Sequence, residues 1–350
     1  MFALLDSPQQ LRQWLAERGE PAYRSAQVER WVYRRRAGGF AGMSDLPAAL
    51  RAGLAETFHL FTSRVAQRRA SADGTEKLLL SLGDGQSLEC VLLRDEKRHC
   101  TACVSTQVGC AMGCAFCASG LGGVVRNLTT GEILEQVLHL QRLLDPAERI
   151  SHVVVMGMGE PLANLPRLLP ALNEMSGRSG LGVSARRITV STVGLPEGIR
   201  RLARSGRQYH LAVSLHAPDD ALRSRLVPAN RRIGIKAILA ATDEYFQVTG
   251  RRVTFEYVLL AGVNDGQAAA RRLAGLLAGR TTVVNLIPYN PVEGLPFAAP
   301  SESAVGRFVE ILLREGLNVR IRRRKGERID AACGQLRRSA ERNLSPAAGL

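Results

Sequence analysis

Three cysteines stand close together in the segment Gly109-Cys110-Ala111-Met112-Gly113-Cys114-Ala115-Phe116-Cys117. Three residues separate Cys110 from Cys114 and two separate Cys114 from Cys117, so one short loop holds three thiols. A structural zinc site uses four protein ligands, and no further Cys or His pair at zinc spacing follows in the chain. A cubane 4Fe-4S cluster held by three cysteines leaves one iron open to a small molecule. The spacing therefore favours a 4Fe-4S cluster with one free coordination position.

This spacing, C-x3-C-x2-C with Phe116 directly before the last cysteine, resembles that of the radical SAM superfamily. The resemblance implies that S-adenosyl-L-methionine (SAM) binds the open iron through its amino and carboxylate groups. It also implies that the cluster passes an electron to the sulfonium of SAM, which starts radical chemistry. A merely structural grouping is the weaker alternative, because chance seldom places three cysteines so close together.

The composition suggests an intracellular protein with a polyanionic partner. The chain has an odd number of cysteines, and its first residues lack the charged and apolar regions of a secretory signal. No stretch reaches the length of a membrane span, so we expect no membrane association and a cytoplasmic location. The formal net charge of +15 is dominated by arginine, which suits bidentate phosphate contacts and makes a nucleic acid a candidate partner.

The first part of the chain differs in character from the remainder. Apolar residues recur at helical spacing, separated by Gly, Pro, Ser or Asp, in residues 8–18, 23–36 and 46–58. We expect residues 1–75 to form a small helical N-terminal accessory domain with basic faces, notably at Arg30 and along Arg34-Arg35-Arg36. Short strands are then expected over residues 78–82 and 87–93.

From residue 101 onward, predicted strands alternate with predicted helices. The strands are expected over residues 101–107, 152–156, 187–191, 210–215, 252–258, 282–287 and 318–321. The helices between them are expected over residues 131–144, 165–176, 196–205, 235–248, 266–278 and 302–315. Such alternation predicts a parallel sheet covered by helices and curled towards a barrel. Six βα units are too few to close an eight-stranded barrel, so we expect an α/β fold with a partial (β/α)6 barrel over residues 76–325.

Polar side chains follow several of these strands, at the edge where active sites form on parallel sheets. In Met156-Gly157-Met158-Gly159-Glu160-Pro161 the glycines allow close approach of a ligand, and Glu160 suits the ammonium group of SAM. Ser191, Ser214-Leu215-His216 and Asn290 end later strands and suit ribose hydroxyls, the adenine edge or the SAM carboxylate. Each of these segments also fits an ordinary turn, so the prediction depends on their meeting at one rim of the sheet.

Two further cysteines stand outside the cluster spacing. Cys333 lies between arginine-rich stretches, whose positive charge favours the thiolate that a nucleophile needs. Cys103 lies on the first predicted strand of the barrel and is a candidate redox partner for Cys333. Both residues also fit small buried core positions. We expect residues 326–350 to form a C-terminal segment that carries Cys333 and ends in a short tail.

Taken together, these segments resemble the RlmN/Cfr family of radical SAM adenosine methyltransferases. The resemblance runs over nearly the whole chain, including the helical N-terminal part, and the segment Asp330–Leu336 is highly specific to the family. The other segments that carry it are Cys103–Leu128, Met156–Leu162, Arg186–Gly194, Ser214–Pro218 and Asn285–Pro291. The resemblance implies methylation of an adenosine in 23S rRNA and, for RlmN-type members, in certain tRNA molecules.

The resemblance also implies roles for individual residues. Cys110, Cys114 and Cys117 correspond to the cluster ligands. Cys333 corresponds to the methyl-carrying cysteine and Cys103 to the cysteine that resolves the covalent adduct. The residues implied to contact SAM are Gly159, Glu160, Ser191, Ser214, Leu215, His216 and Asn290, with Leu215 acting through its backbone. Glu89 corresponds to the general base, but its spacing to Cys103 departs from the family pattern by one residue, so Glu96 stays an alternative.

The implied reaction uses two SAM molecules. Cys333 takes a methyl group from the first, and a radical generated from the second removes hydrogen from that methyl group before it adds to C2 of adenine. Cys103 then forms a disulfide with Cys333 to release the product, while Glu89 removes the C2 proton. A flavodoxin or ferredoxin would supply the electrons, and we expect the protein to be a monomer.

Three other functions compete with this prediction. Cfr-like methylation of C8 of the same adenosine shares the motifs. A basic RNA-binding protein with a purely structural cluster gives no reason for Cys333 or for the Gly159-Glu160 turn. A radical SAM enzyme for a small molecule gives no reason for the positive charge and the helical N-terminal part. The C2 reaction is therefore the main prediction.

Overall fold

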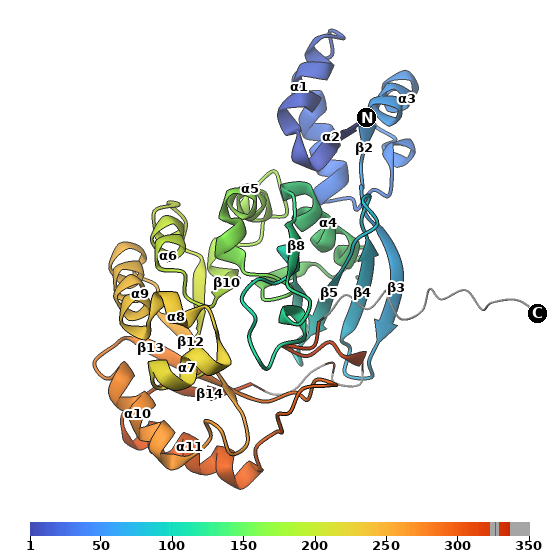
Figure 1. The fold of residues 1–350 in the computed structure, drawn as a ribbon. Helices are drawn as coiled ribbons and strands as arrows, with labels where there is room; N and C mark the ends of the chain where they lie inside the picture. The colour runs from blue at the N-terminus through green and yellow to red at the C-terminus, as the bar shows by residue number, and fades with distance from the viewer. Residues whose placement is uncertain (98, 323–325, 327–328, 337–350) are drawn as a thin grey trace, which may run out of the picture.

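The computed structural model describes residues 1–97, 99–322, 326 and 329–336. In this part of the chain, the centre is a sheet whose parallel strands alternate with helices (Figure 1). The parallel strands are β6 (Cys100–Cys103), β9 (Ile150–Val155), β10 (Ile188–Thr192), β11 (His210–Ser214), β12 (Val253–Leu259), β13 (Thr282–Pro288) and β14 (Val319–Ile321). They follow one another across the sheet in chain order, and each pairs with the next in parallel.

One long helix follows each parallel strand except β14. These helices are α4 (Thr130–Gln141), α5 (Leu165–Ser176), α6 (Pro196–Ala203), α9 (Ile235–Thr249), α10 (Gln267–Leu277) and α11 (Glu302–Arg314). Two short helices, α7 (Asp220–Leu226) and α8 (Asn230–Ile233), come between β11 and α9. The expected partial (β/α)6 barrel is confirmed, with β14 as an additional strand at one edge of the sheet.

Local sequence and burial agree in these units. Val153 and Val155 of β9 and Val190 of β10 are fully buried, as expected for a sheet covered by helices. Helix α4 begins with a capping box in which the Thr129 side chain accepts from the Glu132 N–H and the Glu132 carboxylate accepts from the Thr129 N–H. These bonds satisfy backbone donors that the first helical turn leaves without a partner, so the helix start is well defined.

An antiparallel extension widens the sheet beyond β6. It consists of β3 (Arg64–Ala70), β4 (Glu76–Ser81) and β5 (Ser87–Arg94), with β5 antiparallel to β6. Strands β4 and β5 correspond to the expected strands near residues 78–82 and 87–93. Strand β3 was not expected, because its sequence Arg-Val-Ala-Gln-Arg-Arg-Ala is largely polar and every residue in it is exposed. The sheet therefore begins within residues 1–75, which the sequence analysis assigned to the helical domain.

The expected strand over residues 101–107 is two strands in the structure. β6 ends at Cys103, and β7 (Gln107–Gly109) pairs instead with β8 (Val124–Asn127) in a separate antiparallel sheet. The chain turns between the two strands through Val104–Thr106, whose backbone bonds to the loop after β9. The β7–β8 pair thus closes the base of the loop that carries Cys110, Cys114 and Cys117.

The N-terminal part forms a helical group beside the barrel (Figure 1). Its elements are β1 (Phe2–Ala3), η1 (Leu4–Asp6), α1 (Pro8–Ala16), α2 (Tyr23–Tyr33), η2 (Phe40–Gly42), α3 (Ala48–Thr57) and β2 (Phe58–His59). The Asp6 carboxylate accepts from the Gly131 N–H at 2.6 Å and from the Thr129 hydroxyl at 2.8 Å, at the start of α4. These contacts join the helical group to the first helix of the barrel.

Two arginines of the expected basic face also make contacts with the barrel. Arg34 donates to the carbonyl oxygens of Arg178 and Leu181, and Arg36 donates to that of Leu144 at 2.7 Å. Arg35, in contrast, is exposed and stacks on Trp31. Part of this positive run therefore helps to fix the helical group against the barrel.

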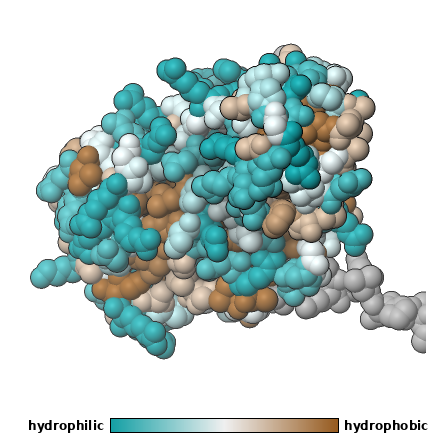
Figure 2. Space-filling model, turned by 90° about the horizontal axis from the view of Figure 1, so that it is seen from above, coloured by the Kyte–Doolittle hydropathy of each residue, from teal (hydrophilic) through white to brown (hydrophobic). Residues whose placement is uncertain are grey.

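The outer surface seen from above is mostly hydrophilic, with smaller apolar areas between the polar side chains (Figure 2). Among the described residues, no helix combines the length and the apolar composition that crossing a lipid bilayer requires.

Candidate active site

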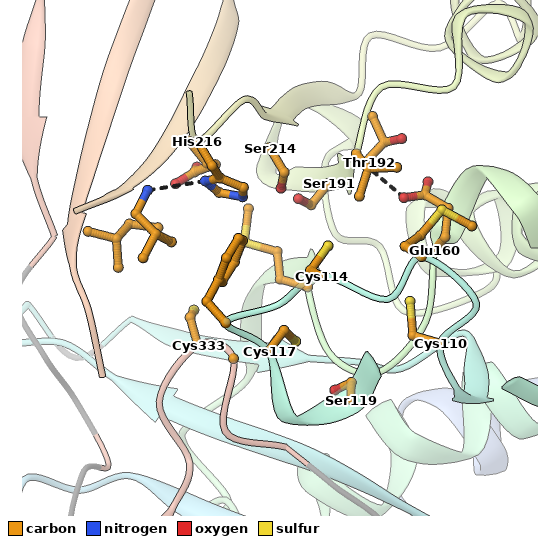
Figure 3. Close-up of a pocket in the computed structure, with 18 of the residues that line it drawn as sticks. Cys110, Cys114, Cys117, Ser119, Glu160, Ser191, Thr192, Ser214, His216 and Cys333 are labelled. Carbon is orange, nitrogen blue, oxygen red and sulfur yellow. Dashed lines mark hydrogen bonds between the residues drawn. The ribbon is translucent and has the colours of Figure 1, made fainter. Parts of the chain in front are cut away.

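A cavity lies at the carboxyl ends of β9 to β13, beside the loop of residues 110–117, which we call the cysteine loop. Most of the residues singled out in the sequence line it. These residues are Cys110, Cys114, Cys117, Gly159, Glu160, Ser191, Ser214, His216, Asn290 and Cys333. Those labelled in Figure 3 come from the cysteine loop, from several strand ends and from the C-terminal segment. The expectation that these groups meet at one rim of the sheet is confirmed by this geometry.

Backbone contacts define the path of the cysteine loop. The Cys110 N–H donates to the Gly123 carbonyl at 2.9 Å, and the Ala115 N–H donates to the Leu226 carbonyl of α7 at 2.9 Å. Gly109 has a φ of +77°, and a Cβ there would lie 2.0 Å from the Gly123 oxygen, so only glycine fits. Phe116 packs edge-on against His216, with ring centroids 4.8 Å apart.

The three thiols of the loop fit a cluster better than a single metal ion. Figure 3 shows them spread along the loop, and among the described residues no three His, Cys, Asp or Glu side chains are grouped as ligands of one ion. In a cubane cluster each cysteine binds a different iron, so the sulfurs do not converge on one point. Burial raises the pKa of Cys110 to about 11 and also raises the pKa of Cys114 and Cys117. Metal binding removes such protons, so a bound cluster would offset the cost of forming these buried thiolates.

Glu160 lies at the cavity wall on the turn after β9. Its carboxylate accepts from the Val193 N–H at 2.8 Å and from the Leu162 N–H at 3.0 Å, and burial raises its pKa. A carboxylate in this position retains lone pairs for a ligand ammonium group. The preceding Gly159 has a φ of +100°, and a Cβ there would lie 2.6 Å from the Gln107 side chain, so glycine is required.

Ser191, Ser214 and His216 line the cavity from the ends of β10 and β11 (Figure 3). The His216 Nδ1 accepts from the Val258 N–H at 3.1 Å, and burial lowers the pKa of this imidazole to about 3. His216 is therefore neutral, with its proton on Nε2. The Asn290 side-chain nitrogen donates to the Cys333 carbonyl at 3.3 Å, while its buried oxygen has no partner among the described residues. An acceptor of this kind suits the amino group of a bound SAM.

Leu215 is placed differently from the other predicted SAM contacts. Its side chain is fully buried in the main apolar core and does not line the cavity. Its N–H donates to the Glu256 carbonyl at 3.0 Å and its own carbonyl accepts from Arg223 at 3.0 Å. Both backbone groups are therefore already bonded, and a backbone contact from Leu215 to SAM stays a prediction.

The segment that carries Cys333 is held against the cysteine loop. The Ala118 N–H donates to the Gly334 carbonyl at 2.8 Å, and the Ser119 hydroxyl donates to the Leu336 carbonyl at 2.7 Å. On the other side, the Gln335 side chain donates to the Pro291 carbonyl at 2.9 Å. These bonds bring a residue far along the chain to the wall of the same cavity.

Cys333 also lines a second cavity that adjoins the first, and Cys103 lines this second cavity too. Burial and the neighbouring Cys333 raise the pKa of Cys103 to about 12. All seven cysteines are free thiols in the structure, so the expected disulfide between Cys103 and Cys333 is not present. That pairing was expected only at the end of a reaction cycle, and it stays a prediction.

Glu89 and Glu96 occupy different environments. Glu89 is buried in β5 and forms an ion pair with Lys77, with Glu89 Oε1 and Lys77 Nζ 2.9 Å apart. Strand alternation places Glu89 on the same side of β5 as Val91 and Leu93, which line the second cavity with Cys103. Neither carboxylate is among the residues that line these two cavities, and Glu96 lies exposed in the turn after β5.

Two charged residues of the site were not identified individually from the sequence. Arg322, directly after β14, lines both cavities, and the charge of Cys333 raises its pKa. Glu256 of β12 lines the first cavity and accepts from the Asn285 side chain at 2.7 Å. Arg322 was visible only as part of an arginine run, and Glu256 stood within an ordinary strand pattern. The rest of that run, residues 323–325, lies outside the described residues.

Comparisons with known proteins agree with this arrangement. Residues 104–274 match the radical SAM superfamily, and residues 3–60 match the ribosomal RNA large subunit methyltransferase N-terminal domain. A probable dual-specificity RNA methyltransferase RlmN of Rhodopirellula baltica is 58% identical over 94% of this chain and 89% of the relative. Its counterpart in Moorella thermoacetica is 49% identical over 94% of this chain and 95% of the relative.

A solved structure shows the same fold. The crystal structure of a radical SAM methyltransferase from Sphaerobacter thermophilus superposes with a TM-score of 0.93 at 46% sequence identity. The match covers 96% of this chain and 99% of that protein. With the identity of the curated relatives over nearly their full length, this chain belongs to the RlmN family of radical SAM RNA methyltransferases.

Proposed function

We propose that this enzyme methylates C2 of an adenosine in 23S rRNA and in tRNA, using two SAM molecules and a methylated cysteine. The observation that supports it most is that Cys333 lines both the cavity of the cysteine loop and the cavity that Cys103 faces. The Cys333 thiol could thus reach SAM in the first cavity and the resolving thiol of Cys103 in the second. The names of the relatives favour the dual-specificity reaction over methylation at C8.

Cys110, Cys114 and Cys117 would hold a 4Fe-4S cluster. Glu160, Ser191, Ser214, His216, Asn290 and the backbone at Gly159 would bind SAM. When bound, the cluster and SAM supply one-electron cleavage of the sulfonium and removal of a hydrogen atom from a methyl group. His216 is neutral and Glu160 is buried, so both would orient the polar groups of SAM from fixed positions in the cavity wall.

The chemistry of the protein's own residues begins at Cys333. The Cys333 sulfur attacks the methyl carbon of SAM, an S–C bond forms, and the sulfonium sulfur leaves with the electron pair of the broken bond as a neutral thioether. Arg322 lines both cavities, so its positive charge lies beside both thiols of the site.

Product release needs Cys103 and a base. The Cys103 sulfur attacks the Cys333 sulfur, an S–S bond forms, and the electron pair of the breaking S–C bond stays with the carbon bound to adenine, which takes up a proton to become the methyl group. Glu89 removes the C2 proton and the adduct gives up one electron, which the cluster would accept, so that the aromatic ring is restored. Glu89 is the better candidate than Glu96, because it is buried on the strand face that leads to Cys103.

The RNA must present a single base to the cavity at the carboxyl ends of the strands. Bases in loops or in unfolded RNA leave their stack at lower cost than bases in a duplex. We propose that the helical N-terminal part ends before β3. This part and β3 would together bind the RNA backbone. Exposed arginines available for this are Arg30, Arg35, Arg64 and Arg69. The sequence also makes the arginines of residues 320–325 candidates for such contacts. Of these, Arg320 is exposed and Arg322 lines the two cavities, while residues 323–325 lie outside the described residues.

Further proposals concern the cellular setting. We propose that the RNA-binding domain is followed by the barrel domain, which ends at about residue 325. Residues 326–350 would form the C-terminal segment that carries Cys333, and its tail after residue 336 lies outside the described residues. A flavodoxin or ferredoxin would donate electrons, and the enzyme would act as a monomer in the cytoplasm.

Mass spectrometry of nucleosides from rRNA and tRNA tests this function directly. A strain without the gene should lose 2-methyladenosine from both RNA classes, and the wild-type gene should restore it. Loss of 8-methyladenosine instead would indicate the C8 reaction. If neither nucleoside changes, the proposed substrate is wrong.

A further inference from the structure

Arg223 on α7 is fully buried and is the largest such side chain in the described part of the chain. Its guanidinium donates to the carbonyl oxygens of Leu215 and Ser214, both at 3.0 Å, and to that of Val193. It also donates to the Asn230 side chain at the start of α8. One side chain therefore ties together the carboxyl ends of β10 and β11 and the two short helices α7 and α8.

All four acceptors of Arg223 are neutral oxygens. Burial lowers the pKa of the guanidinium to about 10, while the charges of Cys114 and Asp220 act in the opposite direction. The Asp220 carboxylate is already bonded to the Asn230 side chain at 2.8 Å and to the Ile235 N–H at 2.8 Å. A buried cation bonded only to neutral groups is costly unless an anion lies close by.

Besides Asp220, the cysteine loop would be an anionic neighbour of Arg223 once its thiolates hold a cluster. The Leu226 carbonyl of α7 accepts from the Ala115 N–H at 2.9 Å. Leu226 and Val227 belong to an apolar cluster with Phe116, against which Cys114 and Cys117 pack. The helix that carries Arg223 thus lies directly on the loop whose thiolates would surround the cluster.

We propose that Arg223 is a positioning residue with two effects on this site, an inference that rests on the proposed cluster and SAM binding. First, it fixes the strand ends that present Ser214 and His216 to SAM. Second, its permanent positive charge stabilises the reduced, more negative cluster and so raises the reduction potential. Neither effect requires Arg223 to touch SAM or RNA.

Two variants separate the two effects. Arg223→Lys keeps the positive charge but cannot reproduce the planar set of donors, and Arg223→Gln keeps polar contacts but removes the charge. Arg225, an exposed residue of the same helix, provides the matched control Arg225→Gln. The reconstituted full-length proteins are compared by an electron paramagnetic resonance titration of the midpoint potential and by equilibrium dialysis with SAM.

Arg223→Gln should shift the midpoint potential to more negative values, whereas Arg223→Lys and Arg225→Gln should keep the wild-type value. Both Arg223 variants should bind SAM about tenfold more weakly, because several hydrogen bonds at the strand ends are lost. A wild-type potential for Arg223→Gln would overturn the electrostatic effect, and wild-type SAM affinity in both variants would overturn the positioning effect.

Two further outcomes are also decisive. If circular dichroism shows that neither Arg223 variant folds, Arg223 serves folding alone and the inference is overturned. If the wild-type protein itself holds no cluster or binds no SAM, the proposed function fails, and the inference fails with it. Normal binding by the wild-type protein combined with unchanged variants overturns only the inference.

Discussion

The Lys77 ammonium nitrogen lies 2.9 Å from the Glu89 carboxylate, and both side chains are buried. Lys77 also donates to the Asp330 carbonyl at 2.9 Å, three residues before Cys333. Asp330 has a φ of +52°, a conformation that few non-glycine residues adopt, so this bond helps to hold a strained turn. One lysine thus connects the candidate base to the segment that carries the candidate methyl-accepting cysteine.

Removal of Lys77 should therefore destabilise the fold. Lys77→Met removes the ammonium group that lies 2.9 Å from the buried Glu89 carboxylate, which should lower the free energy of unfolding by about 3–5 kcal/mol. Urea denaturation followed by circular dichroism measures this change. Lys97→Met, at an exposed position after β5, should stay within about 0.5 kcal/mol of the wild type. Equal stability of the two variants would show that the buried ion pair contributes nothing.

A glycine in the turn after β9 should be essential for stability and SAM binding. Gly159→Ala places a Cβ 2.6 Å from the Gln107 side chain at a φ of +100°. We expect a loss of about 1–3 kcal/mol in the free energy of unfolding and weaker SAM binding, because the Glu160 backbone must shift. The control is Gly122→Ala, where a Cβ meets nothing within 4 Å and φ is not positive. The idea fails if both alanine variants unfold at the same urea concentration.

His139 should make the fold sensitive to mild acid. Its Nε2 lies 3.1 Å from the Ser63 hydroxyl, and burial, followed by the charge of Arg142, lowers its pKa to about 4. Because the unfolded chain binds this proton near pH 6.5, stability is fully present above that pH and is lost as the pH falls towards 4. Between pH 7 and pH 5 the loss due to His139 should be about 2 kcal/mol.

His139→Gln isolates this effect. The nearby Glu135, whose pKa burial raises, is present in both proteins and cancels in the comparison. Urea midpoints at pH 7 and pH 5 should differ less in the variant than in the wild type. The same pH dependence in both proteins would contradict the assignment.

The exposed strand β3 should contribute to RNA binding. The double variant Arg64→Gln/Arg69→Gln should weaken binding of a 23S rRNA fragment and lower the slope of log K against log salt by about two. Fluorescence anisotropy at several salt concentrations measures both quantities. Arg314→Gln on α11, where Arg314 pairs with Glu310, removes one charge elsewhere and should leave affinity unchanged. An unchanged salt slope in the double variant would exclude β3 from the RNA interface.

The barrel could be predicted from sequence because its signals are local. Apolar runs such as His152–Met156 alternate with amphipathic helices, and the structure places strands and helices within a few residues of the expected bounds. Strand β3 could not be predicted in this way, because its residues are exposed and its pairing with β4 is a tertiary contact. The break after Cys103 was missed for a similar reason, since β7 is defined by its partner β8.

The site was predictable where one residue type at one spacing carries the chemistry. The cysteine loop, Glu160 and Cys333 are of this kind, and all of them line one cavity. Arg223 and Lys77 were not predictable, because nothing in their local sequence distinguishes them from surface cations. Only the fold shows that the Arg223 guanidinium is bonded to three backbone carbonyls and that Lys77 joins Glu89 to Asp330.

The most direct test of the methylcysteine route is the fate of Cys103→Ala with SAM, a reductant and an RNA substrate. Without the resolving thiol, the methyl-derived carbon should stay bonded to both Cys333 and the adenine. Mass spectrometry of the intact mixture should then show a covalent protein–RNA adduct, absent from Cys333→Ala. Cys90→Ala, a buried thiol that lines neither cavity, should turn over normally. Free turnover by Cys103→Ala without an adduct would contradict the account.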